Sequence, residues 1–161
     1  MFEDFKPISP KVVARWFVNH ADRDAGELIT PLKLQKLVYY AEAWFLANFD
    51  QPLTNEDYEA WAHGPVVRSL YAKYRKFGWE ALPAEKGERP PEDVSDFLAA
   101  VYEEYGQFSA KKLEKMTHEE APWVKSRGGL PSEAASSKII PKLEIRNFYA
   151  ERLGKEKITA V

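Results

Sequence analysis

Apolar and polar positions follow a helical period along most of the chain. The clearest example lies between residues 34 and 45, where apolar side chains recur at i, i+3, i+4 and i+7. This spacing is typical of an amphipathic helix with one buried face. The preceding Thr30-Pro31 favours a helix start, because Thr accepts from free backbone N–H groups and Pro fits the first turn. The pattern predicts a helix from Pro31 and places Lys36 and Glu42 off its buried face.

The same period recurs in five further segments. They begin at Ser9-Pro10, at Gly64-Pro65, near residue 94, after Ser109 and at Pro141. Thr117 and Glu120 have the spacing of a capping box, which predicts a short helical turn directly after them. Any sheet is expected to be two or three short strands near residues 52–63 and 137–141. The predicted fold class is therefore mainly α, a compact single domain of about six helices with room for two or three short β-strands.

The length of 161 residues fits one domain. No internal repeat or linker is found, so we expect a single domain over residues 1–161, with a core at about 10–153 and a frayed tail at 155–161. The absence of cysteine excludes disulfides and thiolate metal sites. No apolar run approaches the ~18 residues of a membrane span. We expect a cytoplasmic protein without a membrane partner.

The charge balance bears on the choice of partner. The net charge is −2 and the pI is about 6.0, whereas nucleic-acid binders are usually basic. This balance argues against DNA or RNA as the main partner. Five cations nevertheless fall on the second and third predicted helices, namely Lys33, Lys36, Lys73, Arg75 and Lys76. Such a run is usually a solvated face, and the alternative is a patch that steers an acidic protein or RNA.

His63 is the main candidate for chemistry. It directly precedes Gly64-Pro65, and Glu59 lies four residues earlier, where it can pair with His63 on a helical turn. A general base needs an orienting polar group and a substrate within reach. The simpler interpretation is that the ring bonds a backbone group and fixes the turn. A small hydrolase using His63 and Glu59 is kept as an alternative of a different class.

The run His118-Glu119-Glu120 raises the question of a metal site. Zinc needs three or four convergent ligands, and the three histidines, His20, His63 and His118, show no paired i, i+4 spacing. A helix start explains the same residues without a metal. No Gly-rich phosphate loop or nucleophile elbow is found. We therefore expect no catalytic residue, no cofactor and no metal ion.

Three segments together resemble a known family. They are ITPLKLQKLVYYAEAWFLA, YEAWAHGPVVRSLYAKYRKFG and YGQFSAKKLEKMTHEEAPW. Their order and spacing are similar to the SocA-like, or Panacea, antitoxin domain family, which includes phage-associated GepA-like proteins. The resemblance covers roughly residues 10–150.

The resemblance implies a non-enzymatic antitoxin of a toxin–antitoxin system that neutralises a cognate protein toxin by direct binding. The alternative within the family is a proteolytic adaptor that delivers the toxin to a ClpXP-type protease. The identity of the toxin and the oligomeric state stay open.

The motif residues of the family map onto this sequence in two groups. The first is expected to maintain the scaffold, with leucines in the core, Gly-Pro at a helix start and tryptophans packed beneath: Leu34, Lys36, Leu37, Trp44, Glu59, Ala60, Trp61, Gly64, Pro65 and Val66. The second contains candidate toxin contacts: Tyr39, Tyr40, His63 and Tyr71. Because Tyr39 and Tyr40 are adjacent on one helix they cannot face the same way, so one of them is the best candidate for an exposed aromatic anchor.

Overall fold

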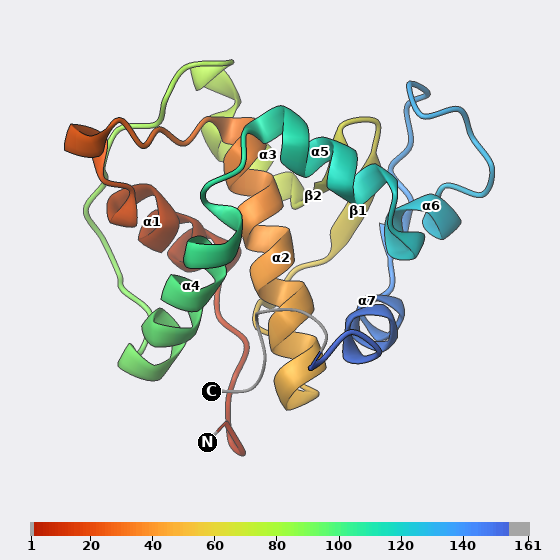
Figure 1. Cartoon of the computed structure of the whole chain (residues 1–161), viewed down its shortest axis with the longest axis horizontal. Coiled ribbons are helices and arrows are strands. Elements are labelled where there is room, and N and C mark those ends of the chain that lie inside the picture. Colours follow the sequence, from red (N-terminus) through yellow and green to blue (C-terminus); the bar gives the residue numbers. More distant parts are fainter. Residues whose placement is uncertain (1, 155–161) are drawn as a thin grey trace.

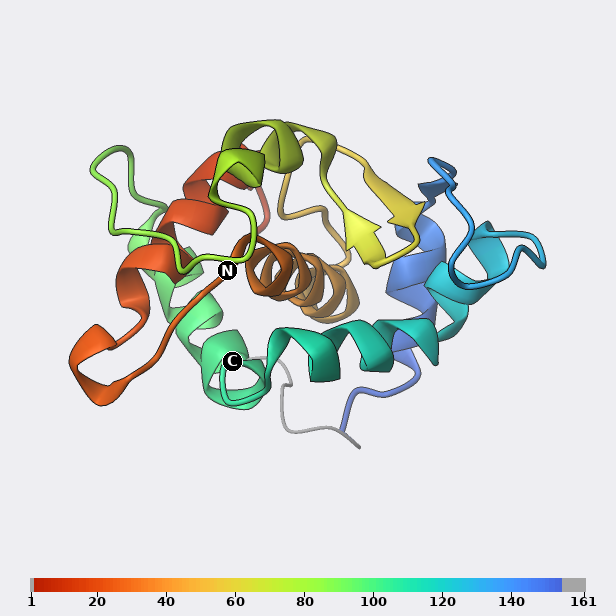
Figure 2. The same ribbon diagram turned by 90° about the horizontal axis from the view of Figure 1, so that it is seen from above.

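A long helix, α2 (Pro31–Phe49), forms the centre of the fold, and the other elements pack around it (Figure 1). The structure is a computed structural model that describes residues 2–154. The tail expected to be frayed, residues 155–161, lies outside the described residues. Seen from above, α2 runs through the middle of a ring made by the remaining helices and a small sheet (Figure 2).

The described part of the chain contains seven α-helices, two 3₁₀ turns and three short strands. In chain order they are α1 (Pro10–His20), η1 (Arg23–Ala25), α2, β1 (Tyr58–Trp61), β2 (Gly64–Val66), α3 (Arg68–Tyr74), η2 (Arg75–Phe77), α4 (Glu92–Tyr105), α5 (Ala110–His118), α6 (Ala121–Ser126), β3 (Ile139–Ile140) and α7 (Lys142–Ala150). The strands form an antiparallel sheet in the order β2-β1-β3. The predicted mainly α fold class is confirmed, and so is the location of short strands near both expected segments.

Local capping signals predicted three helix starts correctly. The side chains of Ser9, Thr30 and Ser109 each accept a hydrogen bond from a backbone N–H in the first turn of α1, α2 and α5. These bonds satisfy donors that have no partner inside the helix. They involve residues two or three positions apart, which is why the sequence alone shows them.

The predicted helix start at Gly64-Pro65 is wrong. These residues form β2, which pairs with β1 so that Trp61 lies opposite Gly64, and α3 begins only at Arg68. Ala62 and His63 make the turn of the hairpin. Gly64 has a φ of +105°, a conformation that only glycine adopts easily. The Gly-Pro pair therefore belongs to a hairpin, whose formation depends on the pairing of two strands and not on a local helix signal.

The capping box predicted at Thr117 and Glu120 is also wrong, although the short helix after it exists. Thr117 lies inside α5, and its hydroxyl donates to the carbonyl of Glu114 at 2.8 Å. Such back-bonding competes with a capping role. Helix α6 starts at Ala121 without a side-chain hydrogen bond at its cap.

The amphipathic pattern of α2 underestimates its burial. Leu34 and Leu37 lie in the core as predicted, but Lys36 and Glu42 are fully buried as well. The reason is the ring of elements around α2, which leaves this helix without a solvated face over most of its length. The carboxylate of Glu42 accepts from the backbone of Leu53 and Thr54 and lies 3.4 Å from the Lys142 ammonium. A buried charge of this kind is tolerated because it is paired and hydrogen-bonded.

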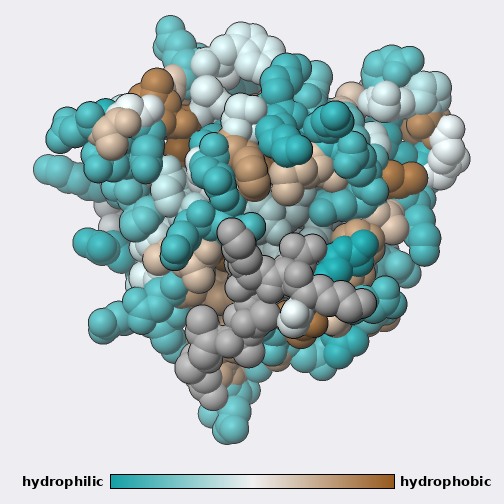
Figure 3. All heavy atoms as spheres, in the orientation of Figure 1, coloured by the Kyte–Doolittle hydropathy of each residue, from teal (hydrophilic) through white to brown (hydrophobic). Residues whose placement is uncertain are grey.

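Apolar side chains on the face shown in Figure 3 are scattered among hydrophilic ones, outside the atoms drawn in grey. None of the helices within residues 2–154 combines the length and the apolar character needed to cross a bilayer.

Candidate functional site

An open groove of about 330 Å³ lies beside the β1–β2 hairpin. Its walls come from the start of α2, the hairpin, α3, η2 and the segment directly after η2. The side chains that define its character are Trp61, His63, Val66, Tyr71, Arg75 and Trp79. The groove is therefore built mainly by aromatic and apolar side chains from several neighbouring elements.

Two of these aromatic side chains are open to solvent. Trp79 is 73% exposed and Tyr71 is 44% exposed. Trp61 packs against Tyr71 with ring centroids 4.9 Å apart, and the Arg68 guanidinium lies over the Trp61 ring at 5.4 Å. Trp, Tyr and Arg are the residue types that dominate binding energy at protein interfaces. Their concentration around one groove makes it the best candidate for a protein-binding surface.

Glu59 holds the hairpin and α3 together instead of pairing with His63. Its carboxylate accepts two hydrogen bonds from Arg68, at 2.8 and 3.1 Å, and one from the Trp61 indole at 2.9 Å. The Arg68 bond in particular lowers the pKa of Glu59. The expected pairing of Glu59 with His63 is wrong, because the two residues lie on a strand and its turn and not on one helical turn.

His63 contacts the carboxylate of Glu114 on α5 through its Nδ1. The expectation that its ring bonds a backbone group is therefore wrong. Burial acts to raise the pKa of Glu114, but the hydrogen bond and charge of His63, together with Lys111, outweigh it and lower the pKa. A carboxylate can orient an imidazole in this way. The 51-residue separation between the two partners explains why sequence spacing could not reveal the pair.

The backbone of β2 and of Val67, the residue directly after it, is held by two adjacent residues of α2. The Gln35 amide donates to the carbonyl of Val67 at 3.1 Å and accepts from its N–H at 2.9 Å. The Lys36 ammonium donates to the carbonyl of Pro65 at 3.0 Å. These contacts give the Lys-Leu-Gln-Lys-Leu segment a structural role, since they position one wall of the groove.

Lys36 reaches Pro65 only because Gly64 has no side chain. A Cβ at Gly64 would lie 2.5 Å from Cε of Lys36 and 2.8 Å from Oγ1 of Thr117. Burial lowers the pKa of Lys36 to about 7, with the charge of Glu114 acting in the opposite direction. Helix α2, strand β2 and helix α5 therefore meet at one close contact, which is formed by Lys36, Gly64 and Thr117.

The five cations expected on one surface do not form a common patch. Lys36 is buried, Lys33 donates to the carbonyl of Gly106, and Lys73 pairs with Glu85 at 2.8 Å. Arg75 and Lys76 are exposed. The idea of a shared patch fails because α2 is central and α3 is peripheral, so that their cations point to different environments.

Neither Tyr39 nor Tyr40 is an exposed anchor. Both are fully buried, because the elements around α2 cover both sides of the helix. Tyr40 stacks on Tyr105 with centroids 4.2 Å apart and donates to Glu120 at 2.8 Å, and Tyr39 packs edge-on against Tyr58. The exposed aromatic positions are Tyr71 and Trp79 instead. Trp79 was not predicted as a contact residue. The available signal was its position directly after Gly78, outside every predicted helical stripe.

The remaining motif residues lie as follows. Trp44 is buried and donates its indole N–H to the Tyr105 hydroxyl at 2.7 Å, whereas Trp61 is only half-buried. Ala60 is buried in β1. His118 stacks on Trp123 with centroids 4.0 Å apart. Within residues 2–154 no group of three or more His, Asp or Glu side chains is arranged to hold a metal ion.

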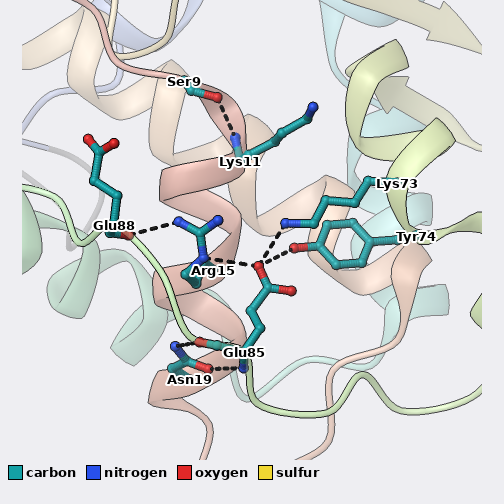
Figure 4. Close-up of polar contacts among 8 residues, drawn as sticks. All are labelled: Ser9, Lys11, Arg15, Asn19, Lys73, Tyr74, Glu85 and Glu88. Carbon is teal, nitrogen blue, oxygen red and sulfur yellow. Dashed lines mark hydrogen bonds and ion pairs between the residues drawn. The ribbon is translucent and has the colours of Figure 1, made fainter.

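The wall formed by α3 is fixed from behind by Glu85 (Figure 4). The Glu85 carboxylate accepts from Lys73 at 2.8 Å and from the Tyr74 hydroxyl at 3.0 Å, and it pairs with Arg15 of α1 at 3.2 Å. Asn19 bonds both the N–H and the carbonyl of Glu85. These contacts tie α1, α3 and the loop after Trp79 together, so the groove is largely formed before any partner arrives.

Fold and groove together define a small helical domain that presents a preformed aromatic surface. The chain belongs to the antitoxin SocA-like, Panacea domain family, whose model matches residues 34–124. The resemblance of the three sequence segments to this family is thereby confirmed. Antitoxin SocA of Caulobacter vibrioides (strain NA1000 / CB15N) is 29% identical over 109 residues, which are 59% of this chain and 58% of that protein. The match thus spans little more than half of the relative's length. No solved structure gives a significant match.

Proposed function

We propose that this protein is the antitoxin of a toxin–antitoxin pair and neutralises a cognate protein toxin by direct binding through the aromatic groove. Membership of the SocA-like family supports the antitoxin role. The observation that carries the proposed surface is the exposure of Trp79 and Tyr71 beside a preformed groove. Large exposed aromatic side chains cost little to desolvate and contribute strongly when buried against a partner.

Binding accounts for the groove better than catalysis does. The hydrolase hypothesis paired His63 with Glu59, but Arg68 and Trp61 occupy that carboxylate, and Glu114 contacts the His63 ring instead. The proposed action is non-enzymatic, in keeping with membership of the antitoxin family, and needs no cofactor or metal. It takes place in the cytoplasm, in keeping with a chain that contains no cysteine.

A proteolytic adaptor is the second candidate function. It would deliver the toxin to a ClpXP-type protease and would need a second surface besides the groove. Exposed apolar side chains outside the groove favour it: Val124 on α6, Ile139 on β3 and Leu143 on α7. Helix α6 packs against both β3 and α7.

Co-expression tests the proposal. The protein encoded by the neighbouring open reading frame is expressed alone and together with this chain, and growth is scored. We expect growth arrest by the neighbour alone and relief by the wild-type chain. Direct blocking leaves the half-life of the toxin unchanged, whereas adaptor activity shortens it only in cells that contain the protease. Failure of the wild-type chain to relieve a toxic neighbour contradicts the proposal.

A further inference from the structure

The segment that borders the groove over α3 and η2 contains more basic than acidic residues. Residues 67–79 contain four cations, Arg68, Lys73, Arg75 and Lys76, and no acidic residue. The whole chain, by contrast, has a net charge of −2. The charge of this segment therefore differs in sign from the net charge of the chain, which favours the approach of negatively charged groups.

Only part of this charge is available to a partner. Glu59 neutralises Arg68 and Glu85 neutralises Lys73, each at 2.8 Å. Arg75 lines the groove itself and is exposed, and within residues 2–154 it has no ion pair. The Lys76 ammonium is also exposed and lies over the Phe77 ring at 5.4 Å. The groove thus offers one free guanidinium, with an ammonium on the next residue.

The floor of the groove selects for apolar groups. Its volume of about 330 Å³ lies at the lower end of the range of ~300–1,000 Å³ that is typical of ligand pockets. Val66 and Leu70 contribute to its lining, and Trp79 and Tyr71 stand at its margin. A space of this size suits one or two large side chains projecting from a polypeptide.

Because the floor of the groove is apolar and its margin carries cations, we infer that the groove binds a segment of the protein partner that is both acidic and apolar. A large aliphatic or aromatic side chain of this segment enters between Trp79 and Tyr71. An Asp or Glu next to that side chain pairs with Arg75. This inference rests on the proposed function and adds the chemistry of the bound segment. Arg and carboxylate form two parallel, charge-assisted hydrogen bonds, which give geometric specificity as well as attraction.

Single-stranded nucleic acid is the competing occupant, because aromatic rings and cations also bind stacked bases. Two observations favour the polypeptide. Two of the four local cations are already neutralised by protein carboxylates, and the chain as a whole is acidic. A backbone-binding groove for nucleic acid needs a continuous positive track.

Selection from a phage-displayed library of random peptides tests the inference on the full chain. We expect the selected peptides to be enriched in Trp, Phe or Leu next to Asp or Glu. The best peptide is then synthesised with a fluorescein label, and its Kd is measured by anisotropy. Trp79→Ala should raise the Kd of the labelled peptide by at least about tenfold. When the library is selected on Arg75→Glu, the residues that flank the apolar side chain should change from Asp or Glu to Lys or Arg.

Matched controls separate the groove from the rest of the surface. Leu143→Ala removes an exposed apolar side chain from α7, and Lys125→Glu reverses an exposed charge on α6, neither of which lines the groove. Both variants should bind the labelled peptide like the wild type. Circular dichroism and the Tm confirm that every variant is folded.

Several results would overturn the inference. The first is that the wild-type chain selects no peptide, and the second is that it selects basic peptides. The third is that Arg75→Glu selects the same flanking residues as the wild type. The fourth is that labelled oligo-dT binds more tightly than the best peptide and that this binding is lost in Arg75→Glu. Growth rescue distinguishes this failure from failure of the proposed function. Rescue by Arg75→Glu and Trp79→Ala equal to the wild type overturns the assigned segment and leaves the antitoxin function intact. Absence of rescue by the wild type, together with the expected peptide preference, overturns the function alone.

Discussion

At the scale of single residues, the polar groups beneath the groove decide how closely its elements approach. Lys36 is fully buried, with its ammonium on the carbonyl of Pro65, and Gly64 leaves room for it. Burying a lysine lowers its pKa because the charged form loses hydration. The contact is therefore sensitive both to pH and to a single methyl group, and each sensitivity gives a prediction.

Replacing Lys36 with Met should remove a pH dependence of stability. The pKa of Lys36 is lowered to about 7 in the folded protein, while the unfolded value is near 10.5. Between these values the unfolded chain binds more protons, so this group makes the wild type more stable as the pH rises, by at most about 1.4 kcal/mol per pH unit. Urea denaturation of both proteins from pH 7 to 9 measures the difference. An equal slope in both proteins would show that Lys36 does not titrate in this range.

Gly64→Ala should destabilise the fold by about 2–5 kcal/mol, because it adds a clash to an unfavourable φ. The new Cβ would lie 2.5 Å from Lys36 Cε. Gly26→Ala is the matched control, since Gly26 also has a positive φ but nothing within 4 Å of a Cβ. Its cost should be only about 1–2 kcal/mol. Similar free energies of unfolding for the two variants would mean that the backbone conformation alone sets the requirement for glycine.

At the scale of elements, α2 and α3 have different tasks. Helix α2 is buried along most of its length and organises the core, whereas α3 is peripheral and presents Tyr71. A peripheral helix of seven residues is too short to be stable by itself and depends on its tertiary contacts. The two elements should therefore respond differently to substitution.

Truncation of the core face of α2 should cost global stability. Leu37 is fully buried, so Leu37→Ala is expected to reduce the free energy of unfolding by about 2–5 kcal/mol. Leu143→Ala, at a position that is 67% exposed, should stay within about 0.5 kcal/mol of the wild type. Chemical denaturation of both variants provides the comparison. A loss below about 1 kcal/mol for Leu37→Ala would be incompatible with a core position.

Loss of the Glu85 carboxylate should loosen α3 locally. Glu85→Gln removes the ion pairs with Arg15 and Lys73 and is expected to cost about 1–3 kcal/mol. Amide hydrogen exchange should become faster in α3 and in the loop over residues 78–91, while α2 keeps its protection. Uniformly faster exchange throughout the chain would instead indicate that Glu85 supports the entire fold.

At the scale of the whole molecule, stability and binding should be separable. Trp79 is 73% exposed, so Trp79→Ala is expected to leave the Tm unchanged within about 2 °C. Because the ring stands at the margin of the groove, the same variant should lose neutralisation of the toxin in the co-expression assay. Differential scanning calorimetry and growth together check this. A large fall of the Tm would place Trp79 among the residues that maintain the fold.

The sequence predicted what local interactions decide. The caps at Ser9, Thr30 and Ser109 and the core leucines of α2 depend on neighbours within one or two helical turns. The errors arose where distant segments meet. Gly64 pairs in a hairpin packed on α2, and His63 finds its carboxylate on α5. The pattern of one chain segment does not show how many other elements will surround it, which is why one of Tyr39 and Tyr40 was expected to be an exposed anchor.

The position of Trp79 also has a practical consequence for spectroscopy. Two of the other four tryptophans, Trp44 and Trp123, are buried, and Trp16 and Trp61 are half-buried, so the ring of Trp79 is the one most open to water. Its emission should dominate the long-wavelength edge of the fluorescence spectrum and respond to quenching by iodide. Any molecule that covers the groove would shift that edge to the blue and shield the ring. The protein thus carries a native optical reporter of occupancy, which needs no added dye.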